Sequence, residues 1–131
     1  MRRNLSILAA LVLLAGPALA CGPATAPAHP SAQEIRTDTS RVVLLLKDHG
    51  KLVEERRKAP GFLRGAALEE PVTPEARAKA EDSLARAATL LAEAEKLATQ
   101  GKTAAARAVA KFTEAEEAAK AALIAIGVHE F

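Results

Sequence analysis

Apolar residues recur three or four positions apart along most of this chain, which is the spacing that places them on one face of an α-helix. Three segments show it: residues 31–58, 74–99 and 103–126. The pattern predicts an all-α fold, a three-helix up-down bundle that occupies residues 31–131. The last two helices are expected to form an alanine-rich antiparallel hairpin with heptad-like seams of the coiled-coil kind.

The first predicted helix has a clear start and an internal weak point. Ser31 and Glu34 have the spacing of a capping box, in which each side chain accepts a hydrogen bond from the other residue's backbone N–H. Gly50 costs about 1 kcal/mol relative to alanine inside a helix, so we expect the helix to bend or divide there. His49, beside it, is expected to be a half-buried packing residue. The apolar face of this helix consists of Ile35, Val42, Leu45, Leu46, Leu52 and Val53.

The segment that follows, residues 59–72, is longer than the two to eight residues usual between the helices of a bundle. We expect Phe62 and Leu63 within it to pack against the helices. The alternative is an exposed loop that takes part in an interaction.

The two helices of the predicted hairpin have strong boundary signals. Thr73 is a suitable N-cap, and Pro74 fits the first helical position, where a missing N–H costs nothing. Gly101 is the usual kind of residue beyond a helix C-terminus. Alanine seams let two helices approach to about 8 Å, but each alanine buries little, so we expect the first helix to cover the hairpin and self-association to add stability. The seams are Ala80, Leu84, Ala87, Leu91, Ala94 and Ala98 in one helix, and Ala105, Ala108, Phe112, Ala115, Ala119, Ala122 and Ile126 in the other.

The N-terminal residues 1–20 have the three parts of a secretory signal peptide. Arg2 and Arg3 form a positive start, an apolar run of eleven residues follows, and Ala18 and Ala20 are small residues at the −3 and −1 cleavage positions. The apolar run is too short for a transmembrane helix, which needs about 20 residues. We therefore expect the chain to be exported and cleaved after Ala20.

The only cysteine, Cys21, directly follows that cleavage position. In this respect the first 30 residues resemble a bacterial lipoprotein precursor. The resemblance implies a diacylglycerol thioether on Cys21, acylation of the new N-terminus, and attachment to a membrane on its periplasmic side. Gly22 in place of aspartate implies the outer membrane by the sorting rule of enteric lipoproteins. The −3 residue of that family is usually leucine and here is Ala18, so ordinary cleavage to a secreted soluble form stays open as the alternative.

The lipidated cysteine is expected to continue into a proline-rich tether, residues 21–30. Three prolines among small residues favour extended conformations of about 3.1 Å per residue, which gives a semi-rigid spacer of roughly 30 Å. His29 in this segment is expected to be a solvated linker residue. The tether would hold the helical domain away from the membrane surface.

The charge of the chain changes when the leader is removed. The precursor has 18 basic and 16 acidic side chains, and cleavage removes Arg2 and Arg3 with no acidic residue, so the mature chain is formally neutral. Residues 36–64 carry eight basic and four acidic side chains, whereas residues 65–131 carry eight and eleven. Such a split is what a self-complementary bundle would show. Without a basic surplus or stacking aromatic residues, nucleic-acid binding is not expected.

The sequence contains no motif of a zinc protease, thiol redox protein, dinucleotide-binding protein, P-loop protein or α/β-hydrolase. Its pairs of adjacent carboxylates do not share a helix face. The sharpest basic cluster is Arg56, Arg57 and Lys58, which would either bind an anionic surface or complement the C-terminal dipole of the helix it ends.

Together these features predict a non-enzymatic cell-envelope lipoprotein without a cofactor, acting as a structural or interaction module toward a protein partner or a second copy of itself. The alternative is a soluble periplasmic helical protein that binds a small ligand or a metal. His49 or the Arg56–Lys58 cluster would then lie in the site.

Overall fold

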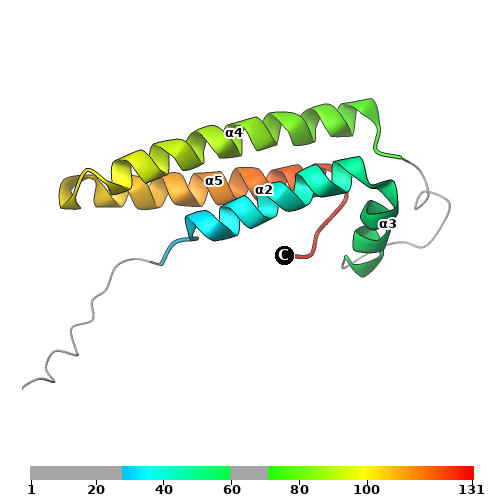
Figure 1. Cartoon of the computed structure of the whole chain (residues 1–131), viewed down its shortest axis with the longest axis horizontal. Coiled ribbons are helices and arrows are strands. Elements are labelled where there is room, and N and C mark those ends of the chain that lie inside the picture. The colour runs from blue at the N-terminus through cyan, green and yellow to red at the C-terminus, as the bar shows by residue number, and fades with distance from the viewer. Residues whose placement is uncertain (1–27, 60–70) are drawn as a thin grey trace, which may run out of the picture.

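The computed structural model describes residues 28–59 and 71–131, and over these residues the chain is helical without strands. The four α-helices of these residues pack together, so the prediction of an all-α helical bundle is confirmed. Figure 1 shows how they are arranged. The leader, Cys21, Phe62 and Leu63 lie outside the described residues. The helices are α2 (Ala32–Lys47), α3 (His49–Lys58), α4 (Pro74–Ala98) and α5 (Ala105–Ala125), with a short 3-10 turn, η3 (Lys102–Ala104), before α5.

The segment predicted as one helix over residues 31–58 is two helices, α2 and α3. The break lies at Asp48, two residues before Gly50, because the Asp48 side chain caps α3 and accepts a hydrogen bond from the Lys51 backbone N–H at 3.1 Å. At the other end of α2 the capping box is confirmed. The Ser31 N–H donates to the Glu34 carboxylate at 2.6 Å, and the Glu34 N–H donates to the Ser31 hydroxyl at 3.1 Å.

Helices α4 and α5 form the predicted antiparallel hairpin and lie side by side along their length (Figure 1). The Thr73 hydroxyl caps α4 by accepting from the Ala76 N–H at 3.1 Å. Gly101 turns the chain with a φ of 84°, a conformation that favours glycine. Of the predicted seams, only Ala98 and Ala105, next to this turn, are exposed. Along the rest of the hairpin, buried alanines form most of the contact between the two helices.

Helix α2 lies against both α4 and α5, and this covers the hairpin with larger side chains. Two apolar clusters result. The cluster toward the α4–α5 turn contains Ile35, Leu90, Leu91 and Phe112. The cluster at the opposite end contains Val42, Leu45, Leu52, Leu123, Ile126 and Val128, so α3 contributes to the core through Leu52.

The last residues form a tail that turns back toward α2 (Figure 1). The Val128 N–H donates to the Leu123 carbonyl at 3.0 Å and the Gly127 N–H donates to the Ile124 carbonyl at 2.9 Å, which is the Schellman pattern of a helix end. Gly127 has a φ of 86°, and Val128 is fully buried. None of the helices described above is long and apolar enough to cross a membrane.

Candidate interaction surfaces

The three residues of the basic cluster, Arg56, Arg57 and Lys58, have different surroundings in the structure. Arg56 is half-buried, and its Nε donates to the Ile126 carbonyl at 2.7 Å, so it caps the C-terminal end of α5. Burial lowers the pKa of its guanidinium. Lys58 Nζ lies 3.2 Å from the Glu54 carboxylate, and Arg57 is exposed. The cluster is therefore not one continuous anion-binding surface.

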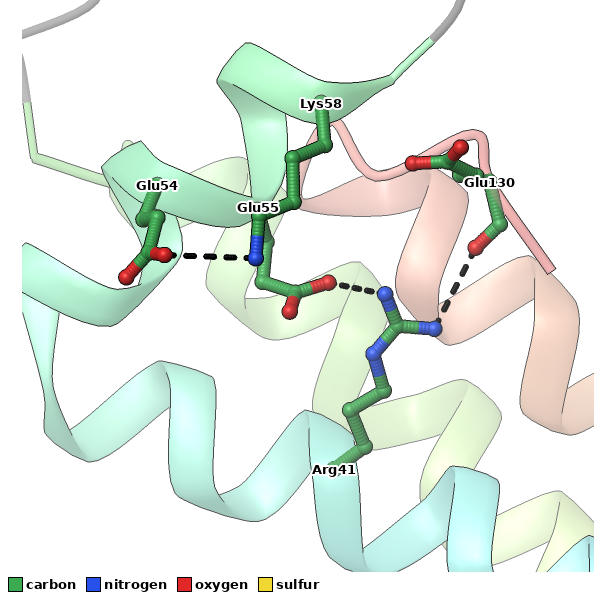
Figure 2. A network of polar contacts seen from close by, with 5 residues as sticks. All are labelled: Arg41, Glu54, Glu55, Lys58 and Glu130. Atoms are coloured by element: carbon green, nitrogen blue, oxygen red, sulfur yellow. Dashed lines mark hydrogen bonds and ion pairs between the residues drawn. The ribbon is translucent and has the colours of Figure 1, made fainter.

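A polar network lies at the end of the bundle that contains Arg56 (Figure 2). The Arg41 guanidinium forms an ion pair with the Glu55 carboxylate and donates to the Glu130 carbonyl at 3.2 Å. These contacts connect α2, α3 and the C-terminal tail. Together with the hydrogen bond of Arg56, these contacts show that the cationic side chains of this region mainly bind other groups of the bundle itself.

Two large apolar side chains of α2 are exposed next to each other, Val43 and Leu44. Val43 and Leu44 are 43% and 47% exposed. They belong to an unbroken apolar run, residues 42–46, and one face of a helix cannot bury all five positions. That run was a sequence signal for exposed apolar side chains, but the predicted apolar face omitted Val43 and Leu44.

Beside Val43 a groove of about 420 Å³ runs between α2 and α4. A second depression of about 360 Å³ continues from it over the outer face of α2. We call the two together the α2–α4 groove. The α4 side of the groove is lined by Leu84, Ala88, Leu91, Ala92 and Glu95, and the α2 side by Arg36, Thr39, Ser40, Val43, Leu44 and Lys47.

Charged side chains lie near both ends of the α2–α4 groove. An ion pair between Arg36 and Glu95 joins α2 to α4 at the end nearest the α4–α5 turn. Lys47 lies at the other end on α2, and Glu81 precedes Leu84 by one helical turn on α4. Helix α2 thus places a cation near each end of the groove, and α4 places a carboxylate near each end. At the Lys47 end α4 also places a cation, Arg77, which lies 3.7 Å from the Glu81 carboxylate and donates to the Leu46 carbonyl at 3.0 Å.

His29 is exposed, but it is not a fully solvated linker residue as expected. Its ring stacks on Phe112 with the ring centroids 5.0 Å apart and the planes at 14°. This contact excludes water from one face of each ring. The two rings border a second groove, of about 470 Å³, at the α4–α5 turn. Its lining is His29, Ala98, Gly101, Lys102, Ala105, Ala106, Ala108, Val109 and Phe112.

His49 is exposed at the first position of α3, so the expectation that it packs half-buried is wrong. The reason is the break at Asp48, which turns the chain before the apolar face of α2 reaches residue 49. Across the two described stretches, no three His, Cys, Asp or Glu side chains are grouped in a way that could hold a metal ion.

A shallow depression under the C-terminal tail contains Asp38, the one acidic group of residues 28–59 and 71–131 whose pKa is raised. Burial raises the pKa of Asp38, and the nearby Lys120 and Arg41 charges oppose this. Lys120 Nζ lies 5.8 Å from the centre of the Phe131 ring, within the range of a cation–π contact. The depression is lined by Gln33, Glu34, Thr37, Asp38, Glu116, Lys120 and Phe131.

Comparisons of the chain with protein-family models, with curated proteins and with solved structures gave no match. Function is therefore inferred from the residues of the chain itself.

Proposed function

We propose that this chain is a non-enzymatic lipoprotein of the bacterial cell envelope, which holds a helical interaction module at a membrane surface. The observation that carries the proposal is the position of Cys21, the only cysteine, directly after a sequence that has the features of a signal peptide and ends in Ala18-Leu19-Ala20. Acyl chains contribute about 0.8 kcal/mol per buried CH₂, so the two or three chains of a mature lipoprotein anchor it firmly.

The place where the chain enters the bundle supports this role. His29 borders the same groove as Gly101 and Lys102, so the tether joins the bundle at the end of the α4–α5 turn. A lipid on Cys21 would hold this end toward the membrane. The 25 residues of α4 span roughly 37 Å, so Arg57 and Lys58 on α3 would face away from the membrane.

In this proposal α2, α4 and α5 act as a three-helix up-down bundle, and α3 is a short addition that closes its far end. The exposed α2–α4 groove runs along the side of the bundle and is the surface available to a protein partner. Gly22 after the cysteine favours the outer membrane as the site of attachment.

The test is intact-mass analysis of the full chain after expression with its leader in a bacterial host. We expect the native protein to carry an acyl mass increment and to fractionate with membranes, and Cys21→Ser to lose both properties. Ala18→Leu is a matched variant that restores the usual −3 residue, and it should make acylation at least as complete. A native mass with no acyl increment would refute the anchor.

The groove at the α4–α5 turn favours a second candidate function, the binding of a small amphiphile by a soluble periplasmic form. Its volume of about 470 Å³ lies within the range of roughly 300–1,000 Å³ typical of ligand sites. Lys102 is the one lysine in its lining, which contains no arginine or carboxylate. A ligand at 100 times its Kd should add about 2.7 kcal/mol of stability. Thermal-shift measurements with fatty acids, on native protein and on His29→Ala, would show whether such binding occurs.

A further inference from the structure

We infer that the α2–α4 groove binds the same groove of a second copy of this chain, with the two copies side by side and pointing in the same direction. This names the partner for the interaction role proposed above, and it rests on that role. The two-fold axis would run parallel to the helices, and the contact would be isologous, the commonest kind in soluble oligomers.

The shape of the groove suits a partner made of two helices. On α2 the groove residues run from Arg36 to Lys47, and on α4 from Leu84 to Glu95. Each stretch covers eleven residue steps, or roughly 17 Å and three helical turns. Ala88 and Ala92 on α4 are small enough to let another helix approach closely. Two copies would form a four-helix arrangement in which each helix lies antiparallel to its neighbours.

The charges at the groove ends select the direction of the second copy. When both copies point the same way, α2 of one lies over α4 of the other at the same level along the bundle. The intramolecular Arg36–Glu95 ion pair marks that level. Arg36 then faces the partner's Glu95, and Lys47 faces the partner's Glu81. Arg77, which pairs with Glu81, adds a cation beside the second of these contacts, so the contact of Arg36 with the partner's Glu95 is the one that favours this direction.

The opposite direction brings like charges together. A two-fold axis perpendicular to the helices would place α2 over the partner's α2 and α4 over the partner's α4. Arg36 would then approach the partner's Lys47, whereas Glu95 would approach the partner's Glu81 together with the Arg77 that pairs with it. Like-charge contacts disfavour this arrangement. The parallel arrangement also leaves both tethers at the same end, so two copies can be anchored in one membrane.

The direction can be tested by disulfide cross-linking, because Cys21→Ser leaves the chain free of cysteine. Ser40 and Ala92 both line the groove at one level, so a mixture of Ser40→Cys and Ala92→Cys chains should cross-link on oxidation. Ala88→Cys is the matched control, since two copies of Ala88 meet only in the antiparallel arrangement. Cross-linking of Ala88→Cys with itself, without the Ser40–Ala92 product, would overturn the inference.

The contact itself can be tested by sedimentation from micromolar to millimolar concentrations. Val43→Glu should raise the dissociation constant of the dimer at least tenfold. Ile124→Glu should leave it unchanged, because Ile124 is exposed to a similar extent, 48%, but lies outside the α2–α4 groove. Circular dichroism melts would confirm that both variants remain folded.

A charge exchange adds a rescue experiment. Lys47→Glu and Glu81→Lys should each weaken self-association several-fold, and an equimolar mixture of the two should restore it, because opposite charges meet again across the heterodimer. A native chain that stays monomeric at millimolar concentration would overturn the inference. If the native protein still carries its acyl mass, that result overturns the dimer alone; a missing acyl mass overturns the proposed anchor.

Discussion

Replacement of Arg56 by alanine tests whether the basic end of α3 is structural. The change removes the hydrogen bond from Arg56 Nε to the Ile126 carbonyl and a cation from the C-terminal end of α5. A hydrogen bond to a charged group contributes about 1.5–3 kcal/mol, and a cation at a helix C-terminus about 0.3–1 kcal/mol. Because the side chain is only half-buried, we expect a loss of about 1–2 kcal/mol, near the lower end of these ranges.

Arg57→Ala is the matched control for this prediction. It removes the same charge from the next position of the same helix, but Arg57 is exposed and forms no ion pair with a described residue. A surface change of this kind usually alters stability by less than about 0.5 kcal/mol. Arg56→Lys should fall between the two, because lysine keeps the charge without the planar guanidinium.

The assay is urea unfolding of the full chain followed by far-ultraviolet circular dichroism, since the chain has no tryptophan or tyrosine to serve as a fluorescent probe. The slope of the unfolding free energy against urea should be the same in all variants, so that midpoints compare directly. Equal losses for Arg56→Ala and Arg57→Ala would refute the structural role of Arg56. The cluster would then have to be reconsidered as a binding surface.

Three further predictions concern stability. Asp48→Ala should cost about 1 kcal/mol through loss of the α3 N-cap, whereas Asp48→Asn should cost little, as urea midpoints would show. Gly127→Ala should destabilise by at least about 1 kcal/mol, as urea midpoints would show, because φ is positive there and a Cβ would lie 2.9 Å from Arg56 Nε. Hydrogen bonds from Ser31 lower the pKa of Glu34 below its usual value of 4.5. The contribution of this carboxylate to stability is therefore complete above that pH and is lost as the pH falls through the lowered pKa. Glu34→Gln should therefore flatten the acid limb of the stability curve, and unfolding measured from pH 7 to pH 3 would show whether it does.

The parts of the fold that follow from local hydrogen bonds could be predicted from the sequence. The capping box of Ser31 and Glu34, the Thr73 cap and the Gly101 turn each depend on a few neighbouring residues, and all are present. The position of the break between α2 and α3 is harder to predict from the sequence. Gly50 weakens a helix, but Asp48 supplies hydrogen bonds that start a new one, and the stronger signal decided the position.

The candidate surfaces depend on contacts between residues distant in sequence, and these could not be predicted. His29 stacks on Phe112, and Arg56 bonds to Ile126, across 83 and 70 residues respectively. No periodicity identifies such pairs in advance. The exposed pair Val43 and Leu44 was an exception, because a run of five apolar residues necessarily leaves some of them outside the core.

The alanine-lined contact between α4 and α5 has a consequence for how the hairpin is aligned. No buried side chain of the described residues is polar or charged, so no hydrogen bond in the core specifies which turn of α4 faces which turn of α5. Buried polar residues often serve this purpose in coiled coils. A shift of one heptad would bring alanine against alanine again. The alignment is therefore fixed by the short connection at Gly101, by Phe112, the one large side chain in the α5 seam beside that turn, and by the surface ion pair of Lys111 with Glu93 at 3.6 Å. The length of this connection therefore helps to set the register of the two helices, while the packing of the helices on either side of it supplies the stability.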